Sequence, residues 1–378
     1  MVGVVGAGQL ARMMAQAAIA LDVEIRLLSA SADDCAALVV PATTVGDERG
    51  LADLSALASG VDVLTFDHEH VPQVHLEALE TAGVVVLPGS AALHHAQDKA
   101  TMRTDLAAVR APVPRFRVLP PGADGPAVAE AADAVGGWPV VLKTARGGYD
   151  GKGVWVVDSP DGDLSALRAG VPVLVEERVP FVRELSALVA RSPSGQAVAY
   201  PVVESVQRDG VCVEVVAPAP GLSAVVAVAA QRLALQVAQR LGVVGVLAVE
   251  LFELADGGLL VNELAMRPHN TGHWTIDGAV TSQFENHLRA VLDLPLGSPV
   301  ARAPVTVMVN VLGGDLPDVH RALRHVLARD PALRVHLYGK RVRPGRKIGH
   351  VTVVGDDLDE LRDRAWHAAD YLSGVIDE

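Results

Sequence analysis

The sequence has little cysteine and no excess of basic charge, and each shortage excludes a class of protein. Its two cysteines, Cys35 and Cys212, are far apart and lack C-x-x-C spacing, so neither a disulfide framework nor a cysteine zinc site is expected. The net charge of −13 argues against nucleic acid or an anionic membrane as the main partner, because both require a broad basic surface. Any anionic substrate must therefore meet a local basic cluster.

Long apolar runs are also missing. No run approaches the roughly 18 residues of a membrane span, and glycines and Arg12 interrupt the apolar start of the chain, so no secretory leader is expected. Together with the scarce cysteines, these absences favour a cytoplasmic protein. The hydrophobic share of 50% is sufficient for the cores of about two or three domains.

Two apolar runs around a glycine turn predict a hairpin within residues 244–274. The turn is Asp256-Gly257-Gly258, and Glu250 and Glu263 interrupt the runs on either side, with Asn262 beside the second acid. A carboxylate among apolar residues is costly unless it is paired or bound to a cation. Two acids and an amide form an all-oxygen set that suits Mg²⁺. The alternative is that both acids lie on the solvent face of an ordinary hairpin.

The start of the chain reads as a strand, a glycine turn and a helix. The strand Val2–Val5 leads into Gly6-Ala7-Gly8-Gln9-Leu10-Ala11, whose amides face whatever lies over the start of the helix. A dinucleotide site would need an acid after the second strand, Val23–Leu28, where the chain has Ser29. NAD is therefore not expected.

Further strands are predicted at Val61–Phe66 and Val84–Leu87. Glu69 follows the first of them, and polar residues at the carboxyl end of a buried parallel strand usually face the ligand crevice. Glu69 is therefore a candidate site residue, whereas the neighbouring His68 and His70 could equally be solvated loop residues.

A helix predicted from about Gln97 to Val109 carries Lys99 and Arg103 on one face. On its own, this spacing indicates a solvated charged face. Farther on, Lys143 ends an apolar strand, and four glycines in the next loop, residues 146–153, could let its amides close over phosphates. The alternative for that loop is a plain flexible turn.

Acids and cations mark the remaining chain. Glu176 and Glu177 end an apolar strand and Glu184 lies in the next strand, where carboxylates could accept hydrogen bonds from an adenine amino group or ribose hydroxyls.

The segment 340–347 holds five cations in eight residues. A phosphorylated metabolite would need such a cluster; the alternative is a solubilising loop. Other predicted elements are helices at 221–241, 281–292, 319–328 and from 358, and strands at 306–312, 335–338 and 351–354.

Taken in order, these features resemble the ATP-grasp superfamily. The motifs G-A-G-Q-L-A-R-M-M, Q-D-K, G-G-Y-D-G-K-G, N-E-L-A-M-R-P-H-N-T-G-H-W and R-P-G-R-K-I-G-H look like those of carboxyaminoimidazole ribonucleotide synthetases, over nearly the whole chain. The resemblance implies an α/β fold, α+β in part. Its parts would be a Rossmann-like pre-ATP-grasp domain (1–97), an ATP-grasp region (98–295) with a lid at about 115–180, and a small C-terminal α/β domain (296–378).

The activity implied by this resemblance is that of an ATP- and Mg²⁺-dependent ligase of purine biosynthesis. ATP would phosphorylate bicarbonate to carboxyphosphate, and the exocyclic amine of aminoimidazole ribonucleotide would capture the CO₂ or the mixed anhydride, giving ADP and phosphate. The resemblance also implies a homodimer.

The resemblance implies the site residues as well. The catalytic residues would be Lys143, Tyr149, Asp150 and Arg267. ATP would be bound by Lys99, Lys143, Gly148, Tyr149, Asp150, Gly151, Lys152, Gly153, Val154, Glu176, Glu177, Arg178, Val179, Glu184, Asn262 and Glu263. Mg²⁺ would be bound by Glu250 and Glu263. The ribonucleotide and bicarbonate would be bound by Gln9, Leu10, Glu69, Tyr149, Asp150, Arg267, His269, Asn270, Lys340, Arg343, Arg346 and Lys347.

The chain departs from the family pattern at three positions. Met266 stands where proline is expected in E-L-A-P-R, Arg103 where lysine is common, and Gln207 near a position that is often histidine, which puts one nucleotide contact in doubt. Two other functions remain open. One is a formate-dependent ATP-grasp ligase similar to the glycinamide ribonucleotide enzyme. The other is a non-catalytic nucleotide-binding protein, although the intact acids and Lys143 argue against it.

Overall fold

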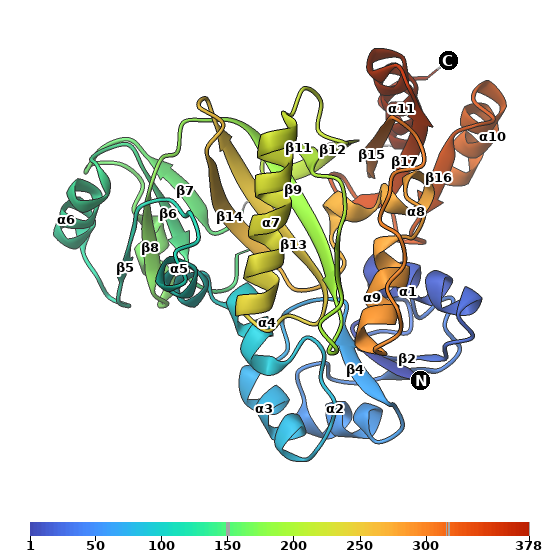
Figure 1. Ribbon diagram of the computed structural model, residues 1–378, viewed down its shortest axis with the longest axis horizontal. Helices are drawn as coiled ribbons and strands as arrows, with labels where there is room; N and C mark the ends of the chain where they lie inside the picture. Colours follow the sequence, from blue (N-terminus) through green and yellow to red (C-terminus); the bar gives the residue numbers. More distant parts are fainter. Residues whose placement is uncertain (149–151, 315, 317, 378) are drawn as a thin grey trace.

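The computed structural model describes residues 1–148, 152–314, 316 and 318–377, which form three sheets with helices packed against them (Figure 1). The predicted site residues Tyr149, Asp150 and Gly151 lie outside these described residues. Within them, every helix is too short or too polar to cross a bilayer.

The N-terminal sheet is parallel, in the order β3-β2-β1-β4. Its strands are β1 (Val2–Val5), β2 (Ile25–Ser29), β3 (Thr43–Val45) and β4 (Val63–Phe66). Its helices are α1 (Gln9–Ala20), α2 (Leu51–Ala58), α3 (Gln73–Thr81) and α4 (Ser90–Gln97). The predicted first strand and helix are confirmed. The strand predicted at 84–87 is wrong as a full strand, because only Val86 pairs there, with Leu64 of β4.

A carboxylate from the end of β4 lies at the start of α1. Asp67 accepts hydrogen bonds from the amides of Gly8 at 2.6 Å and Ala11 at 2.8 Å. The first amides of a helix have no partner within the helix and favour an anion. The chain thus supplies its own anion to the glycine turn, and Asp67 fastens α1 to the neighbouring strand.

Replacing Gly8 tests this cap. A Cβ atom at Gly8 would collide with Asp67 Oδ2, so Gly8→Ala should displace the capping carboxylate and lower the free energy of unfolding by about 1 kcal/mol. Gly125→Ala is the control, because a Cβ atom at Gly125 meets only Leu164 Cδ1 at an ordinary 3.5 Å. The melting temperatures of Gly8→Ala and Gly125→Ala are compared by thermal unfolding. Equal melting temperatures for the two variants would contradict the cap.

The second sheet is antiparallel, in the order β5-β8-β6-β7. Its strands are β5 (Phe116–Leu119), β6 (Val140–Thr144), β7 (Val154–Val157) and β8 (Val173–Glu177). One face packs on α6 (Gly125–Val135), in a core that includes Val128, Leu142 and Val175. Figure 1 shows α6 on the side of this sheet away from the central sheet. We refer to this sheet and α6 as the lid.

The third sheet is central and antiparallel, in the order β14-β13-β9-β11-β12-β15-β17-β16, with β10 paired to β9. Its described strands are β9 (Phe181–Arg191), β10 (Ala197–Ala199), β11 (Val203–Arg208), β12 (Val211–Ala217), β13 (Gly245–Leu254), β14 (Leu259–Ala265), β15 (Val305–Leu312), β16 (Arg334–Leu337) and β17 (Lys347–Gly355). Because β12 pairs with β15, the C-terminal strands extend the sheet that carries the acidic hairpin.

The remaining helices are α5 (Lys99–Ala108), α7 (Ala224–Arg240), α8 (Thr275–Gly278), α9 (Gln283–Val291), α10 (Val319–Arg329) and α11 (Leu358–Ser373). Most of them lie against this central sheet, whereas α5 contacts the lid strand β8 and α4, and α10 contacts α11. Helix α7 packs on β9 and β13, α9 lies between β13 and α1, and α11 packs on β15 and β17 (Figure 1). The helix predicted from Gln97 begins later than expected, because Asp98 ends α4 and caps α5 through the amides of Ala100 and Thr101.

Candidate active site

The predicted hairpin is confirmed, and it brings the two acids together. Strands β13 and β14 are antiparallel, and Glu250 lies directly opposite Glu263. The next pair is Leu251 with Val261, so Asn262 is one extra residue on β14. Such a bulge interrupts the ladder and redirects side chains.

Two like charges and partial burial shape the pKa values of this pair. Burial, and then the carboxylates of Glu263 and Glu184, raise the pKa of Glu250 to about 8. Burial acts to raise the pKa of Glu263, but the nearby cations, first Lys99, which donates to its Oε1, and then Lys143 and Arg103, together leave that pKa below its ordinary value. The pair therefore shares a strongly charged environment, unlike acids on the solvent face of an ordinary hairpin.

Lys143 connects the lid to the central sheet. Lys143 lies in β6. Its Nζ is 2.8 Å from Glu176 Oε2 and donates to Asn262 Oδ1 at 3.0 Å. Glu176 is 2% exposed. Burial would raise its pKa, but the charges of Lys143 and Arg103 hold that pKa below its ordinary value. The predicted ATP residues Lys143, Glu176, Asn262 and Glu263 are thus brought to one place by three strands.

Arg103 contradicts the expectation of a solvated charged face. Its side chain is fully buried, and it donates to Glu176 Oε1 at 2.6 Å and to the carbonyl oxygens of Val261 at 2.5 Å and Asn262 at 3.0 Å. The spacing identified the shared helix face correctly but not its surroundings, because α5 is covered by the lid and β14. Sequence reasoning left Arg103 out of the site.

The glycine-rich segment joins β6 to β7 as a hairpin, as predicted. Arg146, just before it, forms an ion pair with Asp98 at 2.7 Å. A Cβ atom at Gly148 would lie 2.5 Å from the Lys152 carbonyl oxygen, and Gly153 has a φ of +77°. Larger residues would therefore strain both described sides of the loop.

The other predicted ATP residues differ in their surroundings. Glu184, on β9, is half-buried, and burial raises its pKa although Lys143 lowers it. Glu177 accepts hydrogen bonds from the Arg115 amide at 2.7 Å and guanidinium at 2.7 and 2.9 Å. Arg178 lies 3.8 Å from Asp158 at the surface, and Val179 is buried. Glu177 and Arg178 are thus held by lid neighbours.

The predicted substrate residues come from the two ends of the chain and from the segment after β14. Arg267 donates to Glu69 Oε2 at 2.8 Å, and Lys340 Nζ donates to Gln9 Oε1. Leu10 is buried in α1, whereas Arg343 and Arg346 are exposed between β16 and β17. The first residue of the basic segment 340–347 therefore contacts the start of α1, which no local sequence pattern could indicate.

His269 lies between the acids and this basic segment. Its Nε2 is 3.4 Å from Glu250 Oε1, and its Nδ1 lies 2.9 Å from Thr271 Oγ1. Burial, aided by Arg267 and Lys347, lowers the pKa of His269 to about 3, so the imidazole is neutral at physiological pH. Asn270 follows it at the start of a short 3-10 helix (Asn270–Gly272).

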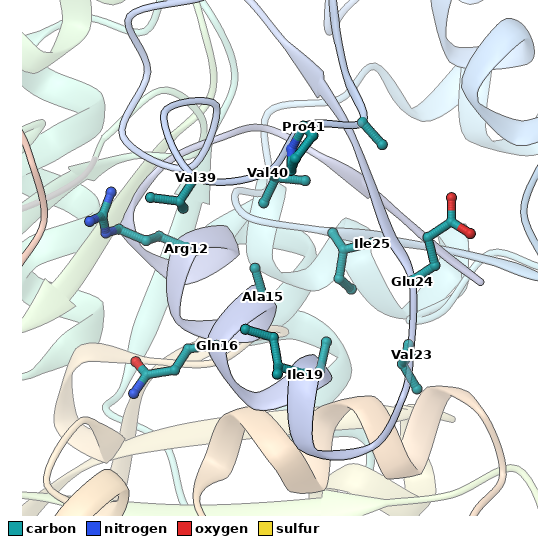
Figure 2. Close-up of a pocket in the computed structure, with 12 residues that line it drawn as sticks. Arg12, Ala15, Gln16, Ile19, Val23, Glu24, Ile25, Val39, Val40 and Pro41 are labelled. Atoms are coloured by element: carbon teal, nitrogen blue, oxygen red, sulfur yellow. The ribbon is translucent and has the colours of Figure 1, made fainter.

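A separate apolar hollow of about 530 Å³ lies on the N-terminal sheet. Figure 2 shows Ala15 and Ile19 of α1 on one side and Ile25, Val39 and Val40 on the other. None of its lining residues belongs to the acids, lysines or substrate residues described above. Apolar walls do not suit phosphates, so this hollow is not part of the candidate site.

A lid with a glycine-rich hairpin, joined through Lys143 to a sheet with paired acids, defines an ATP-grasp enzyme. Comparison with protein families agrees. The ATP-grasp domain matches residues 104–284, the ribonucleotide synthetase preATP-grasp domain matches 1–97, and the phosphoribosylaminoimidazole carboxylase C-terminal domain matches 306–364. The chain belongs to the N5-carboxyaminoimidazole ribonucleotide synthase family.

Individual relatives support this membership. The chain is 58% identical over 380 residues to the N5-carboxyaminoimidazole ribonucleotide synthase of Mycobacterium tuberculosis, covering 99% of this chain and 88% of the relative. The Thermus thermophilus N5-carboxyaminoimidazole ribonucleotide synthetase structure has a TM-score of 0.86 at 37% identity, covering 100% and 99% of the two chains. The Aspergillus clavatus enzyme, solved with ADP and 5-aminoimidazole ribonucleotide, has a TM-score of 0.89 at 31% identity, covering 99% and 98%.

Proposed function

We propose that this ATP-dependent ligase carboxylates the exocyclic amine of 5-aminoimidazole ribonucleotide, with bicarbonate as the carbon source, in purine biosynthesis. The observation that carries the proposal is the acid pair Glu250 and Glu263, which lies opposite in register and beside Lys99 and Lys143. The Aspergillus clavatus relative, solved with ADP and 5-aminoimidazole ribonucleotide, supports the choice of acceptor.

Mg²⁺ fits the acid pair. Glu250 and Glu263 present carboxylate oxygens from adjacent strands, and the raised pKa of Glu250, caused by burial and then by Glu263, indicates repulsion that a divalent cation would relieve. These two residues would hold the ion. When bound, it would offset negative charge on the ATP phosphates.

The chain's cations and its lid carry out the first half of the reaction. Lys99 and Lys143 bind the phosphates of ATP and stabilise the charge that moves as a bicarbonate oxygen attacks the γ-phosphorus and ADP leaves. The glycine-rich hairpin and the lid strands cover the nucleotide and exclude water, because carboxyphosphate is short-lived when solvated. Glu184, half-buried on β9, binds the adenine and ribose side of the nucleotide, whereas Glu176 is buried with both carboxylate oxygens held by Arg103 and Lys143 and acts by positioning Lys143.

The second half of the reaction needs a bound amine. The basic segment 340–347 binds the 5′-phosphate, with Lys340 beside Gln9 and Arg346 farther along the segment. Arg267, oriented by Glu69, stabilises negative charge on the carboxyl group that is transferred. The amine attacks the carbon of carboxyphosphate, or of the CO₂ released from it; in either route the C–O bond to phosphate breaks, inorganic phosphate leaves, and the nitrogen loses one proton.

Product formation tests this function directly. ADP release by the full chain should require ATP, Mg²⁺, bicarbonate and 5-aminoimidazole ribonucleotide together, with one carboxylated ribonucleotide formed per ADP. Turnover with formate and glycinamide ribonucleotide instead would indicate the formate-dependent ligase. Absence of ADP release with every co-substrate present would leave a nucleotide-binding protein.

The family resemblance also supports a homodimer in the cytoplasm. Sedimentation velocity at micromolar concentration should give about twice the 39.4 kDa chain mass. A single species of monomer mass, unchanged by ATP, would contradict the dimer without affecting the reaction proposed above.

A further inference from the structure

One buried guanidinium joins three parts of the active site. Arg103, on α5, donates to Glu176 Oε1 of the lid at 2.6 Å and to two successive carbonyl oxygens of β14, those of Val261 at 2.5 Å and Asn262 at 3.0 Å. Its side chain is fully buried. Neither the sequence motifs nor the predicted site residues gave Arg103 a role.

The two carbonyl groups belong to the bulge of β14. In a regular strand, successive side chains point to opposite faces, so Asn262 and Glu263 would point apart. Here Asn262 is the extra residue between the pairs Glu263–Glu250 and Val261–Leu251. Asn262 Oδ1 accepts from Lys143 and Glu263 accepts from Lys99, so both side chains reach the phosphate-binding lysines.

Strand β14 is the edge strand of its sheet, and its bulge leaves one further residue unpaired, so buried carbonyl groups at this edge need donors from outside the ladder. Arg103 supplies these donors from one rigid plane and at the same time fixes Glu176, which holds Lys143 at 2.8 Å. A guanidinium presents five donors in a planar fork, whereas an ammonium is a single point charge on a flexible stem. One lysine could therefore not satisfy the same three acceptors with equal geometry.

We propose that Arg103 is a positioning residue that holds the β14 bulge, and thereby aims Asn262 and Glu263 at the phosphates while tying that strand to the lid. The proposal rests on the proposed function, because it takes Glu263 as a ligand of Mg²⁺. It predicts that replacing the Arg103 guanidinium changes kcat and the half-saturating Mg²⁺ concentration more than it changes the melting temperature.

The test compares Arg103→Gln, Arg103→Lys and the wild type in the ADP-release assay, well below the melting temperature. Arg103→Gln should lower kcat at least tenfold and raise the half-saturating Mg²⁺ concentration about tenfold. Arg103→Lys should recover part of both losses. If Arg103→Gln does not fold, Arg103→Lys alone should still raise the half-saturating Mg²⁺ concentration severalfold.

Arg183→Gln is the matched control. Arg183, on β9, also binds two acids and a carbonyl oxygen, pairing with Glu253 at 2.5 Å and Glu204 at 2.9 Å and donating to the Pro220 carbonyl oxygen. A purely structural role for Arg103 predicts lower melting temperatures for Arg103→Gln and Arg183→Gln alike, with kcat and half-saturating Mg²⁺ within twofold of wild type in both; that result would overturn the proposal. An inactive wild type would instead refute the proposed function.

Discussion

Glu263→Gln should lower kcat by a hundredfold or more, about 3 kcal/mol, while nucleotide binding stays close to that of the wild type. Glutamine keeps the size of the side chain but removes the charge opposite Glu250, which weakens the hold on Mg²⁺ where phosphoryl charge develops. It also leaves Lys99 without the carboxylate to which it donates. Steady-state ADP release and calorimetric binding of ADP measure the two effects.

The same hairpin offers a control for this prediction. Glu253 lies on β13 and pairs with Arg183 at 2.5 Å, so Glu253→Gln removes one charge from the hairpin without touching the lysines. Its kcat should stay near that of the wild type. A kcat of Glu263→Gln within about threefold of the wild type, or about 0.7 kcal/mol, would contradict the assignment of Glu263 as a ligand of Mg²⁺.

Arg346→Ala should raise the Michaelis constant for 5-aminoimidazole ribonucleotide by ten- to a hundredfold, about 1.4 to 3 kcal/mol, with little change for ATP. A guanidinium can donate twice to a phosphate group. The backbone of Arg346 is held by its carbonyl oxygen, which accepts from the Gly313 amide at 2.7 Å. Truncating the side chain removes only its long, 3.4 Å contact to the Arg341 carbonyl oxygen and should leave the loop in place, and Arg346→Lys should recover only part of the loss.

Arg341 is the matched control in the same segment. Its exposed side chain faces Asp33 at 3.4 Å, and it is not among the predicted substrate residues. Arg341→Ala removes the same charge and should change neither Michaelis constant by more than about twofold. If Arg346→Ala and Arg341→Ala behave alike, general attraction by a basic loop explains the effect, and the choice of substrate is reopened.

Local sequence patterns were sufficient for the acidic hairpin and for most elements. Two apolar runs and the turn at Asp256-Gly257-Gly258 predict β13 and β14, and the short turn fixes a register that places Glu250 near Glu263. The strand that ends in Lys143 and the glycine-rich hairpin follow from the same kind of pattern. These features depend on contacts between near neighbours in the chain.

Features that depend on distant contacts could not be predicted. The bulge at Asn262 has no local signature, because one extra residue changes register without changing the apolar pattern. The burial of Arg103 depends on Glu176, 73 residues away. The cap on α1 comes from Asp67, 56 and 59 residues from its partners. Each is decided by which elements pack together, and that information is absent from a short window of sequence.

The pairing of β12 with β15 also determines what a shortened chain could do. A chain ended near residue 295, where family resemblance places a domain boundary, would lose β15 and expose one whole edge of β12, a strand whose residues are almost all buried. An open, apolar edge of this kind recruits other strands, so such a fragment should aggregate instead of yielding a smaller ATPase. The shared sheet also joins the strands that flank the basic segment 340–347 to the strands of the acid pair, so these two parts cannot separate without distorting one sheet, whereas the lid is a sheet of its own.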